Sequence, residues 1–149
     1  LYPILFAAFG LGIIRKGKGN RRLKVIGVLI LAYSAFNLYW PPMHMRGIEP
    51  TLTDNLHILW AMITVIFMVV IMGYGAISLG KRFQVYTIAS ILLLSAFGIL
   101  TSLEAPNIPI HGPTPWIGLW ERINIGIFMI WVVVFAIMLM RKSHILPSR

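Results

Sequence analysis

The side chains that could carry chemistry gather in two stretches of this chain, residues 44–57 and 104–122. Imidazole and carboxylate groups are the types that bind zinc or transfer protons in enzymes. The chain has no cysteine, which excludes disulfides, thiolate metal ligands and a cysteine nucleophile. The polar set of the two stretches is His44, Arg46, Glu49, Asp54, His57, Glu104, His111, Glu121 and Arg122.

One interpretation of this set is a zinc site. His44, His57 and His111 offer nitrogen ligands, and the nearby carboxylates offer oxygen ligands. In a metal-dependent hydrolase acting on a lipid, Asp54 and His57 would be ligands or the general base, and Glu121 the acid. No two histidines are four residues apart, as in the His-Glu-x-x-His motif, so the signal for zinc is weak. We predict no cofactor.

The same residues have structural explanations, which we favour. Asp54 and His57 are three residues apart at the start of a predicted helix, so their side chains share a face. Thr53 or Asp54 is expected to cap the first turn, and His57 to lie in the membrane interface.

Arg122 and Glu121 begin the last apolar stretch. The carboxylate of Glu121 is expected to favour the positive end of the helix dipole. Arg122 is expected to pair with Asp54 or Glu104 and so join two helices, because an arginine at the edge of hydrocarbon usually finds a carboxylate. Binding of an anionic lipid headgroup is the functional competitor for Arg122.

The elements that position these residues follow from composition. Hydrophobic residues make up 58% of the 149 residues and charged residues only 11%, whereas soluble domains carry about 25% charged residues. So few charges cannot cover a water-facing surface, which indicates an integral membrane protein. A span requires about 17 to 25 apolar residues. The apolar stretches are Leu1–Ile14, Val25–Trp40, Leu56–Leu79, Gln84–Leu103 and Trp120–Met140.

These stretches predict an all-α fold, a single transmembrane domain over residues 1–149 with about five spans. Leu1–Ile14 is too short to cross alone, and we interpret it as the remainder of a longer helix. Small residues such as Gly75 and Gly98 are expected to let helices approach closely. Ser34 and Ser90 are expected to hydrogen-bond between helices.

Charge predicts the sidedness of the bundle. Eleven of the 13 Lys and Arg lie in residues 15–24, 81–82 and 141–149, and alternate crossing places these segments on one side. By the positive-inside rule they and the C-terminus are cytoplasmic, in a cell membrane, and the four carboxylates lie outside. This clustering in short loops speaks against nucleic acid as a partner. Tryptophans expected as anchors at the outer boundary are Trp40, Trp60, Trp116 and Trp120.

Four motifs resemble those of a prokaryotic membrane family catalogued as domain of unknown function 998. They are PMHMRG at 42–47, LTDNLH at 52–57, GKRFQVYTIA at 80–89 and TPWIGLWERIN at 114–124. The resemblance covers about residues 25–142 and implies a multi-helix membrane protein, commonly of about six spans. It implies no activity.

The leading functional hypothesis is a non-catalytic membrane protein, either an accessory subunit or a lipid- or ligand-binding module. Its expected partners are the lipid bilayer and other membrane subunits. The metal-dependent hydrolase described above is the first alternative. A small-solute transporter is the second, disfavoured because no charged residue lies in the middle of a predicted span.

Overall fold

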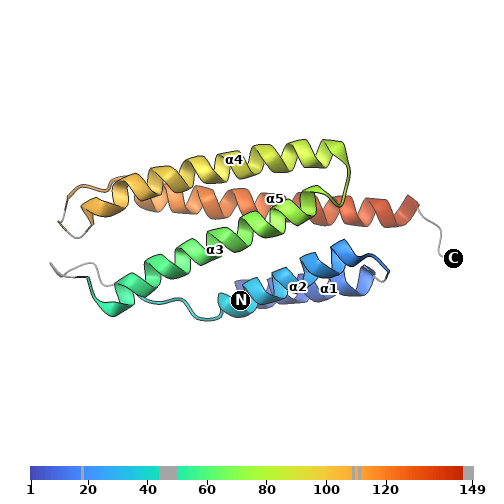
Figure 1. Ribbon diagram of the computed structural model, residues 1–149, viewed down its shortest axis with the longest axis horizontal. Helices are drawn as coiled ribbons and strands as arrows, with labels where there is room; N and C mark the ends of the chain where they lie inside the picture. The colour runs from blue at the N-terminus through green and yellow to red at the C-terminus, as the bar shows by residue number, and fades with distance from the viewer. Residues whose placement is uncertain (18, 44–49, 109, 111, 146–149) are drawn as a thin grey trace.

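The protein is all-α, as predicted. A computed structural model describes residues 1–17, 19–43, 50–108, 110 and 112–145, with side chains to Arg141. Its elements are five helices and one 3-10 turn, and all the helices lie roughly along one axis (Figure 1). In chain order they are α1 (Tyr2–Lys16), α2 (Arg21–Phe36), α3 (Leu52–Ala76), α4 (Lys81–Glu104), η1 (Ala105–Asn107) and α5 (Ile117–Ile145).

Helices α1 and α2 form a short antiparallel hairpin. The loop between them is smaller than the basic run 15–24 predicted, because Arg and Lys are good helix formers and extend both helices into it. Asn20 starts α2 by accepting hydrogen bonds from the backbone N–H groups of Arg22 (3.0 Å) and Leu23 (3.3 Å). The predicted stretch Val25–Trp40 is thus shifted four residues toward the N-terminus, to Arg21–Phe36.

A glycine pair sets the distance between these two helices. A Cβ atom on Gly27 would lie 2.8 Å from the carbonyl oxygen of Gly10 and 2.5 Å from Cγ1 of Ile14. Small residues at a crossing let membrane helices pack backbone to backbone. Neither position tolerates a side chain without moving a helix.

Helices α3, α4 and α5 are long and apolar enough to cross a membrane. Their candidate spans are Leu52–Ala76, Lys81–Asn107 and Ile117–Arg141. Three of the five predicted spans therefore meet this criterion. α1 has 15 residues and α2 has 16, about 22 and 24 Å of helix, against a hydrocarbon core of about 30 Å.

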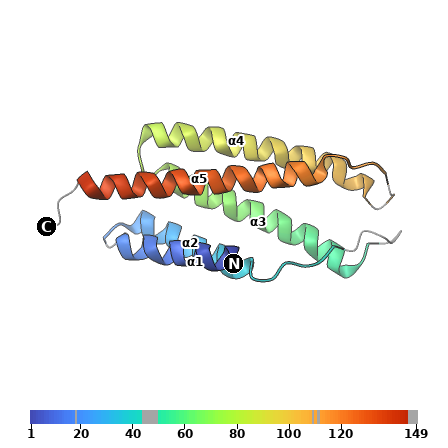
Figure 2. The same ribbon diagram turned by 180° about the vertical axis from the view of Figure 1, so that it is seen from behind.

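The short hairpin packs against only part of the long three-helix unit. Figures 1 and 2 show α1 and α2 beside the half of α3 that leads to the α3–α4 turn. The chain then runs from the end of α2 along α3 to that helix's start, at the opposite end of the bundle (Figure 1). We call the end with the α1–α2 and α3–α4 turns the basic end. The end with the start of α3 and the α4–α5 connection is the acidic end.

Trp131 is the centre of the core. Its fully buried ring stacks on Phe128 and Phe135 of its own helix α5, with ring centroids 6.3 and 5.1 Å apart. Gly75 of α3 makes room for it, because a Cβ there would lie 2.5 Å from the indole. Phe128 also meets Phe6 of α1 at 5.8 Å, so the aromatic stack joins the short hairpin to the long unit.

Two polar side chains tie α4 to α5 inside the bundle. The indole N–H of Trp131 donates to Oγ1 of Thr87 at 2.8 Å, and both residues are fully buried. Asn124 donates to the carbonyl of Leu94 (2.8 Å) and accepts from the N–H of Gly98 (3.2 Å) once its amide is oriented to suit both. Buried polar atoms must be paired, so these contacts fix the register of the two helices.

The serines predicted to join helices do not do so. Ser34 donates to Ile30 (2.8 Å) and Ser90 to Tyr86 (2.9 Å), in each case the carbonyl four residues earlier in the same helix. A short hydroxyl side chain reaches its own helix backbone most easily.

We expect Gly27→Ala to destabilise the hairpin by about 1–3 kcal/mol, because its Cβ would meet backbone and not a flexible side chain. Thermal unfolding in detergent measures the effect. The control is Gly126→Ala in α5, where a Cβ meets no atom within 4 Å and the change gains helix propensity. Equal melting temperatures for the two variants would contradict the close crossing.

Candidate functional site

The described polar residues of the acidic end form two groups on different helices. One group lies at the start of α3 and the other at the α4–α5 connection. In both views of the ribbon these two places are apart (Figures 1 and 2). The first group contains Asp54 and His57, two of the three candidates for a catalytic role, and the second contains Glu121.

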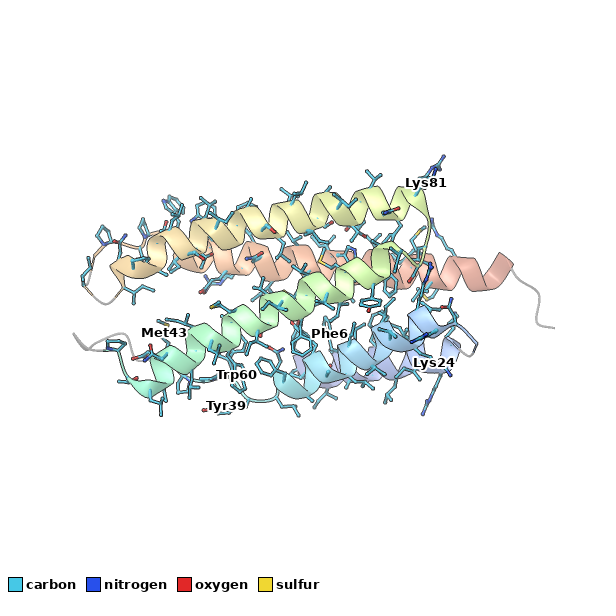
Figure 3. The ribbon with its side chains drawn as sticks, viewed as in Figure 1. Phe6, Lys24, Tyr39, Met43, Trp60 and Lys81 are labelled. Atoms are coloured by element: carbon cyan, nitrogen blue, oxygen red, sulfur yellow. The ribbon has the colours of Figure 1, made fainter. Side chains whose placement is uncertain are left out.

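The first group is built around a segment that is not helical. Residues 38–43 leave α2 and run beside α3 toward its start (Figure 1). Trp60 of α3 contacts both the end of α2 and this segment: its ring stacks on Phe36 at 4.3 Å and meets Tyr39 edge-on at 6.0 Å. Its indole N–H donates to the carbonyls of Phe36 (3.2 Å) and Tyr39 (3.0 Å) (Figure 3). Trp60 thus pairs carbonyl groups that the end of α2 would leave without partners.

His57 binds the same segment one helical turn closer to the start of α3. Its Nδ1 lies 2.8 Å from the carbonyl oxygen of Pro41, and its ring meets Trp40 edge-on at 5.5 Å. A carbonyl can only accept, so Nδ1 carries the proton and Nε2 is left to accept or to bind a ligand. Pro41 and Pro42 bring no N–H groups to this segment, which lowers the number of donors that need partners.

Asp54 completes a capping box. The N-cap of α3 is Thr51, two or three residues before the positions predicted. Thr51 donates its N–H (2.8 Å) and its hydroxyl (2.6 Å) to Oδ2 of Asp54, while the N–H of Asp54 donates to Oγ1 of Thr51 (3.3 Å). The prediction that Asp54 serves the helix start is confirmed, with Thr51 as the cap in place of Thr53.

The second group joins the α4–α5 connection to the end of α4. Glu104 accepts from the backbone N–H of Trp116 at 3.3 Å and from the indole N–H of Trp120 at 3.4 Å. Arg122 donates to the carbonyl of Gly118 at 2.8 Å, one turn earlier in its own helix. Glu121 is exposed in the second turn of α5, which begins at Ile117, so its predicted place in the first turn is wrong.

The site predictions therefore meet different outcomes. Within the described chain, Arg122 donates to a carbonyl of its own helix and Glu104 accepts from Trp116 and Trp120. The predicted ion pair of Arg122 stays a prediction. His44, Arg46, Glu49 and His111 lie outside the described residues. Among those that are described, no three His, Asp or Glu side chains come close enough to share a metal ion.

The tryptophans divide by burial. Trp40 and Trp116 are exposed, 44% and 55%, as interfacial anchors should be. Trp60 and Trp120 are half-buried, and their indole N–H groups donate hydrogen bonds within the protein. The carbonyl-binding role of Trp60 was missed, and the only signal for it in the sequence is Pro41-Pro42, which shows where the chain cannot be helical.

Comparison with known proteins finds one family. The family model described as Protein of unknown function (DUF998) matches residues 1–138. No curated protein and no solved structure matches this chain.

We expect Trp60→Phe to lower the free energy of unfolding by about 1 kcal/mol, because the half-buried Phe36 and the exposed Tyr39 lose the indole N–H that their carbonyls share. Trp116→Phe is the matched control, since that indole is exposed. Thermal unfolding in detergent compares the two. Similar losses for both variants would show that the indole N–H of Trp60 has no special role.

Proposed function

The chain belongs to the family of proteins of unknown function DUF998, and we propose that it is a non-catalytic, multi-pass membrane module with all five helices in the bilayer. The observation that carries this proposal is the use of its acidic-end side chains. The carboxylates of Asp54 and Glu104 each accept from backbone, hydroxyl or indole groups of the same end. A catalytic site would hold such atoms ready for substrate.

Two features support five crossings. The hairpin α1–α2 exposes large apolar side chains such as Leu5 (59%) and Val28 (57%), which suit lipid and not water. In the segment after α2, the carbonyls of Tyr39 and Pro41 are paired by Trp60 and His57, which suits irregular backbone at membrane depth. Trp60 lies eight residues into α3, about 12 Å along the helix from its start.

The same topology gives the orientation. The basic end carries Lys16, Lys24, Lys81 and Arg141, and the positive-inside rule makes it cytoplasmic. The acidic end then faces outward. This orientation also places the exposed Trp40 and Trp116 at the outer boundary.

Single cysteines test the orientation directly, because the chain has none of its own. We expect Pro42→Cys and Pro115→Cys to react with a membrane-impermeant maleimide in intact cells. Lys24→Cys and Arg82→Cys should react only after permeabilisation. Labelling of Lys24→Cys on the outside, with Arg82→Cys inside, would show that α1 and α2 do not cross as proposed.

Asp54→Ala separates a structural from a catalytic role for the carboxylate. The capping box predicts a loss of about 1 kcal/mol and a lower melting temperature. Glu121→Ala, at an exposed position of α5, should change the melting temperature little. Metal analysis of the purified protein completes the test. One zinc ion per chain, lost in both Asp54→Ala and His57→Ala, would instead establish a metal site and favour the hydrolase.

A transporter is supported less well. No Asp, Glu, Lys or Arg occurs in residues 55–80, 83–103 or 123–140, the interiors of the three long helices. Transport sites for charged solutes normally place such residues there.

A further inference from the structure

An apolar cleft opens at the basic end, far from the polar groups described above. Its volume is about 580 Å³, within the range of small-molecule sites. One wall is a face of α1 that includes Phe9, Gly12 and Ile13, and the facing wall is the last part of α5, with Ala136 and Leu139. Leu23 of α2 and Leu79 of the α3–α4 turn also line it.

Polar groups line the cleft only near its end. Lys16 belongs to the last turn of α1, Asn20 caps α2, and Ser78 lies in the α3–α4 turn. The cleft therefore combines a long apolar interior with one exposed ammonium group. That division matches an amphiphile with an apolar chain and a negative head.

The surrounding charge has one sign. Lys24, Lys81, Arg82 and Arg141 are exposed at the basic end, and Figure 3 shows Lys24 and Lys81 on opposite sides of it. The sequence has no Asp or Glu in residues 1–43, 76–103 or 123–149, which supply every wall of the cleft. Each Lys or Arg near a membrane surface attracts anionic lipid by about 1 kcal/mol.

We propose that this cleft binds one anionic phospholipid of the surrounding leaflet, with an acyl chain between α1 and α5 and the phosphate at Lys16. The assignment rests on the chain lying in a bilayer with its basic end at the headgroups, as proposed above. The bilayer supplies this ligand at high concentration, and the cleft lies between two helices that would face it.

Gly12 offers a clean way to fill the cleft. Gly12 lines the cleft, and a Cβ there meets no atom within 4 Å, so a substituted side chain begins in open space at the cleft wall. Gly126 of α5 has the same property and does not line the cleft, which makes it a matched control.

The experiment uses the full chain reconstituted in equal parts phosphatidylglycerol and phosphatidylcholine with identical acyl chains. After transfer to detergent, native mass spectrometry counts the lipids that each chain retains. We expect one phosphatidylglycerol on the wild type and on Gly126→Trp, and none on Gly12→Trp. Where Gly12→Trp does not fold, Gly12→Leu provides the smaller filling, and melting temperature reports folding for each variant.

Lys16→Gln tests the headgroup contact against Lys24→Gln, which removes the same charge outside the cleft. We expect phosphatidylglycerol to bind about fivefold more weakly to Lys16→Gln, the factor that corresponds to about 1 kcal/mol. Lys24→Gln should weaken binding less than Lys16→Gln, because Lys24 adds to the charge of the basic end but does not line the cleft. An equal loss for the two variants would contradict a headgroup contact at Lys16.

Several outcomes would overturn the proposal. Equal retention of the two lipids would remove the role of charge, and equal retention by Gly12→Trp and Gly126→Trp would place the lipid elsewhere. If oleate displaces phosphatidylglycerol at equal concentration, the ligand would be a free fatty acid and not a phospholipid. If the wild type is a dimer and Gly12→Trp is a monomer, the occupant of the cleft would be a second copy of the chain. Cysteine labelling distinguishes these failures from failure of the membrane topology itself.

Discussion

The fold depends on the pairing of backbone carbonyls where α2 stops. α2 ends at Phe36, part-way along α3; Asn37 and Leu38 still donate to carbonyls of α2, and residues 39–43 continue without regular secondary structure. In hydrocarbon each unpaired polar group costs several kcal/mol, so the protein must supply donors. Trp60 and His57, three residues apart on one face of α3, donate to carbonyls of this segment. These two side chains therefore lower the cost of connecting the short hairpin to a long helix through irregular backbone.

That connection makes the aromatic core necessary. A hairpin of only 15 and 16 residues has little surface with which to hold its place. Phe6 and Tyr33 bring it against Phe128, and the stack continues through Trp131, for which Gly75 leaves space. Without a hydrophobic force between helices in lipid, such close packing and the bond from Trp131 to Thr87 provide the association.

The two ends of the bundle differ in what their polar residues do. At the acidic end the carboxylates of Asp54 and Glu104 are turned back on the protein, where they hold a helix start and a loop. At the basic end the ammonium of Lys16 borders an apolar cleft with no carboxylate in the surrounding segments. The feature that stands out for ligand binding is therefore at the end opposite the one that residue types suggested.

The sequence alone determined the membrane environment, the helical class, the three long spans and the separation of basic from acidic segments, because each follows from composition or from charge order along the chain. It also indicated that Asp54 belongs to a helix start. It could not determine what Trp60 and His57 bind, since those partners are carbonyls 16 to 24 residues away that carry no side-chain signal. The cleft was likewise decided only by tertiary structure, because a void depends on how far α1 and α5 diverge, which no local pattern records.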